Sequence, residues 1–427
     1  MKALHRRIGC LILGWTLLVP AVASAQWQVM NGGNALKNGR VDTVGPVSAT
    51  ERWRAPHNSP FGMPVFVDGG IVVTTRLVPS PPGNIAADLE GVIVGLRLDT
   101  GQVLWTRTLP VDDPQTDWTG RALALRDGRV YASRSGFGPT KTALYALDAA
   151  TGATLWRAFR LTAPRAFSTL DYDGPAFLGN GDLLLGNGGG ATFRLRPSDG
   201  ATIFEFFRFT GSISGGREPL IVGDGNPLYL RGGGFGGTIA NWDLASGTLR
   251  YQSPEVGGFQ TPLFANDSQS LYVPGTDALH AYKDTGTAFI EKWSYPNGSP
   301  ITGLSTHAVG PDGSVYFYAA RADGVVVVRL DPDSGLELAA SPPIRSGNEC
   351  VQCYMAVDRN RTLYVSNGSG GNKLFAFRPN LSLLWQQDIG FSGGGPALAS
   401  DGTLLIDTPS GLVAYNTDPV FGSGFEP

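Results

Sequence analysis

The chain has 427 residues, of which 59 are glycine and 30 are proline, while only 16% are charged and the formal net charge is −3. This composition is typical of many short strands joined by tight turns, so we expect an all-β protein. The small negative charge provides no basic surface, so we expect neither nucleic acid nor an anionic membrane as a partner.

Residues 1–25 have the pattern of a cleavable signal peptide. Three basic residues precede an apolar stretch over residues 8–22, and small residues at 23–25 provide a cleavage site. The apolar stretch is short and is interrupted by Pro20, so we do not expect it to act as a membrane anchor. Cys10 precedes most of this stretch, which excludes it as a lipidation site. We therefore expect a secreted or periplasmic protein without a membrane anchor.

One segment type recurs roughly every 40 to 50 residues along the mature chain. Its clearest copies are residues 95–105 and 145–156, in which an apolar strand is followed by a Thr-Gly turn and a strand that ends in Trp105 or Trp156. Glycine takes the positive φ that closes a hairpin, so each copy predicts a two-stranded hairpin. We expect the terminal aromatic residue to pack between adjacent sheets. Weaker copies lie at residues 195–204, 242–251, 281–293, 330–339 and 375–385.

A second pattern precedes most of these hairpins and supplies two further strands. A proline begins an apolar strand, as at Pro64 and Pro219, and a polar turn and a second apolar strand follow. Proline is tolerated at the first residue of a strand because no ladder hydrogen bond is needed there. Each repeat therefore predicts four strands and no helix.

The count of repeats predicts the architecture. Seven complete units lie between Pro64 and Gly390, and an eighth begins at Pro396 but lacks its last strand. Residues 49–53, which end at Trp53, match the missing strand. Because ring closure removes both open sheet edges, we expect an all-β, eight-bladed β-propeller of four-stranded blades, closed by this N-terminal strand. Seven blades are the alternative if one weak repeat is misread. The propeller domain is expected to span residues 26–419.

The aromatic-ended Asp-x-x-Thr-Gly repeats resemble those of the pyrroloquinoline-quinone (PQQ)-like propeller family. Residues 27–34 also resemble the Trp-x-x-x-x-Gly-x-Asn start that is common in this family. The resemblance covers nearly the whole mature chain and implies the propeller fold, but a fold does not fix a function. Quinoprotein alcohol dehydrogenases of this type hold PQQ over a calcium ion, and no calcium ligand or catalytic aspartate can be matched here. We therefore expect no cofactor, with PQQ and calcium as the alternative.

The mature chain has two cysteines, Cys350 and Cys353. They are separated by two residues, whereas the quinoprotein enzymes have a disulfide between adjacent cysteines. Tyr354 stands where a c-type haem site would need histidine, and no helix is expected to activate a redox dithiol. We expect a local disulfide.

Three other motifs are expected to be ordinary loops. Residues 232–237 fit Gly-x-Gly-x-x-Gly and residues 390–394 fit Gly-x-Ser-x-Gly, but a strand rather than the required helix is expected after each of them. Residues 331–335 resemble a calcium loop but lack the distal glutamate. We expect no metal site.

A ligand is expected at the mouth of the propeller channel, where loops converge on a rigid scaffold. Alignment of the repeats places Arg121, Glu218 and Tyr354 just before innermost strands and His307 within one. These four are the candidate ligand-binding residues, and a buried core histidine is the alternative for His307. No cluster of carboxylates or histidines accompanies them, so no catalytic residue is expected.

These observations favour a monomeric, non-enzymatic binding or scaffold module for a protein or glycan at the cell envelope or outside the cell. An outer-membrane assembly lipoprotein with the same repeat is the relevant analogue. The alternative is a secreted oxidoreductase that uses PQQ and calcium. Residues 420–427 form a C-terminal tail, which is either a sorting or processing tag or a disordered terminus.

Overall fold

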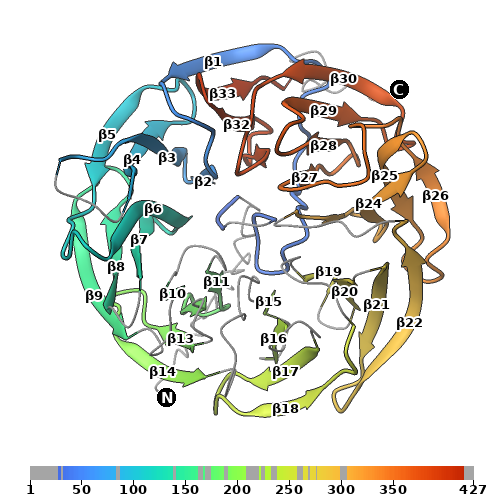
Figure 1. The fold of residues 1–427 in the computed structure, drawn as a ribbon, viewed down its shortest axis with the longest axis horizontal. Helices are drawn as coiled ribbons and strands as arrows, with labels where there is room; N and C mark the ends of the chain where they lie inside the picture. Colours follow the sequence, from blue (N-terminus) through green and yellow to red (C-terminus); the bar gives the residue numbers. More distant parts are fainter. Residues whose placement is uncertain are drawn as a thin grey trace, which may run out of the picture.

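The chain folds as a ring of antiparallel β-sheets (Figure 1). The computed structural model describes residues 27–29, 32–82, 87–137, 141–161, 167–168, 175–186, 191–207, 221–222, 227–231, 238–256, 263–267, 270–275, 277–298 and 305–417. No helix is assigned within these ranges, so none of these residues forms a helix that could cross a membrane.

The repeated Thr-Gly turn closes the outer hairpin of a blade, as predicted. Between β8 (Lys141–Asp148) and β9 (Thr154–Leu161), the Asp148 carboxylate accepts hydrogen bonds from the N–H groups of Ala150 and Thr151. Gly152 has φ 70° and its N–H donates to the Asp148 carbonyl at 2.8 Å. This left-handed conformation strains any residue with a Cβ atom, which explains the recurrent glycine.

The blades follow one another around the ring in chain order, and within each blade the strands run from the centre to the perimeter (Figure 1). The first blade consists of β2 (Phe66–Asp68), β3 (Ile71–Pro79), β4 (Leu89–Arg97) and β5 (Val103–Thr108). The next sheet contains β6 (Asp117–Arg126), β7 (Arg129–Phe137), β8, β9 and β10 (Phe167–Ser168). After it come β11 (Ala176–Phe177), β12 (Leu183–Gly186), β13 (Ala191–Leu195) and β14 (Thr202–Phe207).

The second half of the ring repeats this order. Its strands are β15 (Ile221–Val222), β16 (Pro227–Arg231), β17 (Ile239–Asp243) and β18 (Leu249–Gln252); β19 (Phe264–Ala265), β20 (Ser270–Pro274), β21 (Ala278–Asp284) and β22 (Phe289–Pro296); β23 (Ala308–Val309), β24 (Val315–Arg321), β25 (Gly324–Leu330) and β26 (Glu337–Ala340); and β27 (Tyr354–Val357), β28 (Leu363–Ser366), β29 (Lys373–Phe377) and β30 (Leu383–Asp388).

The closing sheet combines strands from distant parts of the chain. It contains β31 (Ala397–Leu398), β32 (Leu404–Thr408), β33 (Gly411–Tyr415) and, on its outer edge, β1 (Glu51–Pro56). The β1 strand pairs antiparallel with β33, so that Trp53 lies opposite Ala414. The strand that ends at Trp53 therefore closes the ring, as its lack of a preceding repeat predicted.

The prediction of eight four-stranded blades is wrong, because seven of the sheets in the described part of the chain have four strands and the sheet that contains β6 to β10 has five. The fifth strand arises because β7 continues past Arg134, its last residue paired with β8. This extension leaves Gly136 and Phe137 available, and β10 pairs with both of them. The sequence repeat did not predict β10 because this two-residue strand lies outside the repeated pattern.

Tryptophans on the outermost strands join neighbouring blades. Trp105 of β5 lies against Gly152 of the next blade, where an added Cβ would come within 2.6 Å of the indole ring. The indole Nε1 donates to the Ala149 carbonyl at 2.8 Å. Trp53, Trp156 and Trp293 donate in the same way to Leu98, Pro197 and Pro332. The prediction that these aromatic residues pack between sheets is confirmed.

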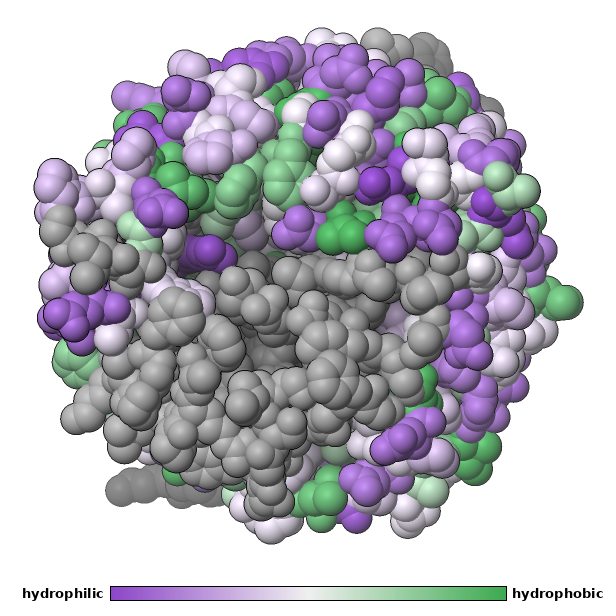
Figure 2. Space-filling model, viewed as in Figure 1, coloured by the Kyte–Doolittle hydropathy of each residue, from purple (hydrophilic) through white to green (hydrophobic). Residues whose placement is uncertain are grey.

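The hydrophobic core lies between neighbouring blades rather than at one central point. In one cluster, Phe317 of β24 and Val327 of β25 are buried together with Met355 and Val365 of the following blade. The described surface seen in Figure 2 mixes hydrophilic and hydrophobic side chains around the perimeter. Each blade is therefore stabilised mainly by the faces that it buries against its two neighbours.

Candidate functional site

An N-terminal segment within residues 27–46, described at 27–29 and 32–46, crosses the centre of the ring instead of adding to a blade (Figure 1). Its backbone forms hydrogen bonds with innermost strands on several sides. The Trp27 and Gln28 carbonyls accept from Val67 of β2 and Leu125 of β6, at 2.8 and 2.9 Å. Farther along, carbonyls of the segment accept from Ala265, Val309 and Val357 of β19, β23 and β27. The segment therefore links five innermost strands that are far apart in sequence.

Two buried side chains fix this segment. Lys37 is 1% exposed, and its Nζ donates to the Pro175 carbonyl at 3.1 Å. Asn38 is also 1% exposed, and its Nδ2 donates to the Ala265 carbonyl at 2.9 Å. Gly39 has φ 64°, and a Cβ at this position would lie 2.9 Å from the Met355 carbonyl oxygen. The close approach of the two backbones thus requires glycine.

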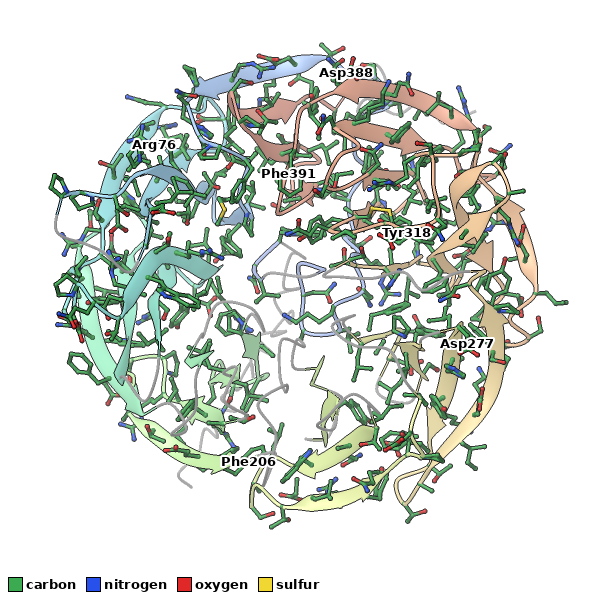
Figure 3. All side chains as sticks on the ribbon, viewed as in Figure 1. Arg76, Phe206, Asp277, Tyr318, Asp388 and Phe391 are labelled. Atoms are coloured by element: carbon green, nitrogen blue, oxygen red, sulfur yellow. A yellow bond between two sulfur atoms is a disulfide. The ribbon has the colours of Figure 1, made fainter. Side chains whose placement is uncertain are left out.

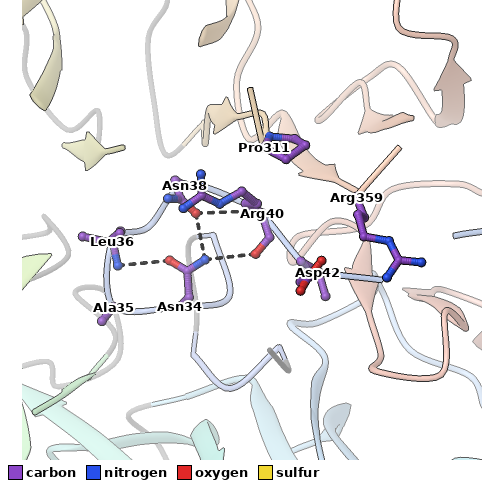
Figure 4. Close-up of a pocket in the computed structure, with 9 residues that line it drawn as sticks. Asn34, Ala35, Leu36, Asn38, Arg40, Asp42, Pro311 and Arg359 are labelled. Carbon is purple, nitrogen blue, oxygen red and sulfur yellow. Dashed lines mark hydrogen bonds between the residues drawn. The ribbon is translucent and has the colours of Figure 1, made fainter. Parts of the chain in front are cut away.

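A pocket of about 500 Å³ lies between this segment and two turns of the ring (Figure 4). The turn between β23 and β24 contributes Pro311, and the turn between β27 and β28 contributes Arg359. The remaining lining residues belong to the segment and are Asn34, Ala35, Leu36, Asn38, Arg40, Val41 and Asp42. The Asn34 side chain donates to Asn38 Oδ1 at 2.8 Å, which holds the floor of the pocket in a fixed loop.

The charged groups of the pocket are two arginines and one aspartate. Arg40 is half-buried, and its guanidinium donates to Asn266 Oδ1 at 3.3 Å and to the Gly310 carbonyl at 3.4 Å. Arg359 and Asp42 are exposed, and Asp42 lies between the two arginines in Figure 4. The Arg359 N–H donates to the Thr43 carbonyl at 2.8 Å, which fixes the backbone that carries this side chain.

The predicted residue His307 is completely buried, immediately before β23. Its ring packs against Phe264, Phe317 and Tyr318, with ring centroids 4.6 to 5.4 Å apart. Neither ring nitrogen forms a hydrogen bond with a residue that the structure describes. Burial lowers the pKa of His307 to about 3. His307 therefore lies in the core, and its role in ligand binding stays a prediction.

The other predicted binding residues lie apart from the pocket. Tyr354, the first residue of β27, is 7% exposed, and burial raises its pKa well above the ordinary value. It is near Tyr318, whose pKa is also raised well above the ordinary value, mainly by burial. Arg121 lies in β6 and is half-buried. Glu218 lies outside the described residues. A binding role for these residues stays a prediction.

The pocket was not predicted from the sequence, because the candidate binding residues were chosen just before or within the innermost strands and the pocket lies after them. The predicted residues His307 and Tyr354 lie at the starts of β23 and β27, whereas Pro311 and Arg359 follow the ends of these two strands. Arg40 and Asp42 precede the first blade and belong to no repeat. The available signal was the polar stretch from Asn34 to Asp42 between the Trp27 motif and the first strand.

The two cysteines form the predicted disulfide, with the Cα atoms of Cys350 and Cys353 5.7 Å apart. Both are completely buried, in the core cluster that also contains Tyr318 (Figure 3). The Ser305 hydroxyl donates to the Cys350 carbonyl and accepts from the Cys353 N–H at 3.1 Å. The disulfide therefore lies within the loop before β27, and the Ser305 hydroxyl joins this loop to the loop before β23.

The described residues do not form a site that fits PQQ with calcium. No group of three or more histidine, cysteine, aspartate or glutamate side chains in these ranges could hold a metal ion. The centre of the ring is crossed by residues 27–46, and the disulfide lies in the core. The expectation that no cofactor is bound stays a prediction, and we derive no reaction step through either group.

The loop motifs behave as ordinary turns where the structure describes them. Residues 390–394 lie between β30 and β31 and lead into a strand. In the turn after β25, the Asp331 carboxylate accepts from the N–H groups of Asp333 and Ser334, at 3.0 and 2.8 Å, so it caps its own turn. Residues 232–237 lie outside the described ranges, as do the predicted signal peptide and the tail at 420–427.

Antiparallel sheets of mostly four strands arranged radially, with β1 and β33 paired in one closing sheet, define a β-propeller. Residues 37–206 and 207–418 match the family model described as outer membrane protein assembly factor BamB. The chain belongs to this family, and the predicted resemblance to PQQ-like repeats is confirmed. No curated protein sequence matches the chain.

Solved structures share the fold at low sequence identity. The quinohemoprotein alcohol dehydrogenase from Comamonas testosteroni is 13% identical, with a TM-score of 0.63 over 91% of this chain and 80% of that one. BamB from Moraxella catarrhalis is 14% identical, with a TM-score of 0.55 over 88% and 99%. The computationally designed protein Ika8 is 13% identical, with a TM-score of 0.59 over 86% and 99%. An enzyme, an assembly factor and a designed protein thus share the architecture, which does not fix the function.

Proposed function

We propose that this chain is an exported, non-enzymatic propeller that binds a protein partner at the pocket between residues 34–42 and the turns at Pro311 and Arg359. The pocket carries the proposal, because it is a concave site with fixed walls and several polar groups. Its floor is held by hydrogen bonds to innermost strands, so little ordering is needed on binding.

Two further observations support this proposal. The family is named for an assembly factor of outer membrane proteins, which is a role in association with other proteins. The leader pattern at residues 1–25 supports export to the periplasm or the outside of the cell. A protein is favoured over a glycan because the planar guanidinium groups of Arg40 and Arg359 match the geometry of carboxylates, which protein side chains supply.

Site-specific photocrosslinking tests the proposal. A photoreactive amino acid is introduced at Asp42, which lines the pocket, and as a control at Leu336, which is 68% exposed beside the perimeter strand β26. Both variants are produced in cells of the native host and irradiated. We expect a crosslinked protein adduct from position 42 that is absent from position 336.

Two outcomes would contradict the proposal. Identical adducts from both positions would indicate nonspecific contact, and the absence of any adduct at position 42 would remove the pocket as a protein-binding site. Dye-linked dehydrogenase activity after addition of PQQ and calcium to the purified protein would instead support the oxidoreductase alternative.

A further inference from the structure

The pocket has two arginines, Arg40 and Arg359, that form no ion pair with an acidic side chain of the described chain. Arg359 is exposed, and its guanidinium forms no ion pair or hydrogen bond with a described residue. Arg361, two residues later, is paired with Asp312 at 2.9 Å. The Asp312 carboxylate of the adjacent turn is thus already paired, and the exposed Arg359 guanidinium is accessible to a group from outside the chain.

Arg40 provides a second positive charge in a fixed position. Its two acceptors, Asn266 Oδ1 and the Gly310 carbonyl, are neutral, so they orient the guanidinium without cancelling its charge. Arg40 is half-buried, where screening by solvent is weaker than at a fully exposed site. Asp42 is the only acidic lining residue, so the described lining keeps an excess of positive charge on a protein whose formal net charge is −3.

We infer that this pocket binds carboxylate groups of an acidic protein segment, with Arg359 as the main contact and Arg40 as a preoriented second cation. This inference rests on the proposed function and specifies the chemistry of the partner. Arginine binds carboxylates with two parallel N–H···O bonds, so the contact is directional as well as electrostatic. Asp42 opposes binding by repulsion and restricts where a second carboxylate of the ligand can lie.

Fluorescence anisotropy with a labelled hexaglutamate peptide tests the inference, and labelled hexaglutamine is the uncharged control. We expect the full chain to bind hexaglutamate more tightly than hexaglutamine, with affinity that falls as salt increases. Arg359→Ala should weaken binding about fivefold and Arg359→Glu more strongly, because single exposed ion pairs contribute modestly. Asp42→Asn should strengthen binding about two- to fivefold, since it removes a repulsive charge.

Arg107→Ala is the matched control, because Arg107 is an exposed arginine on the perimeter strand β5 and should leave peptide binding unchanged. Equal loss of binding in Arg359→Ala and Arg107→Ala would overturn the inference by showing a nonspecific charge effect. Stronger displacement of the peptide by inorganic phosphate than by acetate at equal ionic strength would overturn the assignment to carboxylates.

The two proposals fail in distinguishable ways. If hexaglutamate binding does not depend on Arg359 while position 42 still crosslinks a protein in cells, the carboxylate inference is wrong and the proposed function stands. If Arg359-dependent binding is found but position 42 crosslinks nothing, the pocket is an anion site and the proposed function is wrong.

Discussion

His307 is a fully buried histidine, and its ring nitrogens form no hydrogen bond within the described part of the chain. Burial lowers its pKa from the ordinary value of 6.5 to about 3. Between these values the unfolded chain binds a proton at this position and the folded chain does not. The free energy of unfolding therefore falls as the pH decreases from 6.5, by at most about 1.4 kcal/mol per pH unit from this group.

Replacement of His307 by leucine should remove this contribution. We expect His307→Leu to be at least as stable as the wild type at pH 7, because His307 forms no hydrogen bond with the described residues. Its stability relative to the wild type should rise by about 2 kcal/mol between pH 7 and pH 5. Urea unfolding at the two pH values measures this change. His280→Leu, at a partly exposed histidine that pairs with Glu291, is the control. Parallel pH dependence of His307→Leu and the wild type would contradict the prediction.

Single residues of the candidate site were the least predictable part of the molecule. His307 and Tyr354 were chosen because the repeat places them near innermost strands, but the repeat does not determine whether a side chain faces the ring centre or a neighbouring sheet. Both are buried in the structure. Arg40 and Arg359 line the same pocket only because the N-terminal segment crosses the ring. No local pattern in the sequence predicts that crossing.

At the scale of the hairpin, the turn glycine adopts a left-handed backbone conformation and also contacts the tryptophan of the preceding blade. These two effects can be tested separately. Gly152 has φ 70° and also lies against the Trp105 ring of the preceding blade, whereas Gly128 has the same φ with no atom within 4 Å of an added Cβ. Gly128→Ala should cost about 1 kcal/mol, from backbone strain alone. Gly152→Ala should cost a further 1 to 3 kcal/mol, roughly, because the methyl group collides with the indole.

Urea unfolding of the two alanine variants measures the difference. Equal destabilisation would show that the contact between Gly152 and Trp105 adds nothing to blade stacking. A larger loss of stability in Gly152→Ala would show that the recurrent geometry of this turn also joins neighbouring blades.

The hairpins were predictable because each is encoded within about a dozen residues, by an Asp or Ser, a glycine with positive φ and a terminal aromatic residue. Innermost strands such as β11 and β19 have only two residues and could be located only through the adjoining strands. The additional strand β10 depends on the extension of β7 beyond Arg134, which is a tertiary effect without a sequence signal.

For the whole ring, the joint between β1 and β33 should control closure. Gly411, the first residue of β33, has φ 144°, and an added Cβ would lie 2.6 Å from the Ala55 carbonyl oxygen of β1. Gly411→Ala should therefore displace β1 and increase hydrogen exchange over residues 51–56. Hydrogen-exchange mass spectrometry of this peptide measures the effect.

Gly324 offers a matched control. It begins β25, has φ 137°, and an added Cβ would lie 2.3 Å from the Arg345 carbonyl oxygen, far along the chain from the joint. Gly324→Ala should strain its own blade and leave exchange over residues 51–56 unchanged. Equally fast exchange of this peptide in both variants would mean that β1 responds to general destabilisation.

The closing sheet also sets an order of events during synthesis. The ribosome makes β1 near the beginning of the chain and β33 near its end, so β1 remains without its partner while the blades between them are made. At about 5 to 20 residues per second, this delay lasts roughly 20 to 70 s. During it β1 is an unpaired strand that could associate with other chains, and its charged residues Glu51, Arg52 and Arg54 oppose such pairing. The ring can therefore be completed only after β33 has been translated.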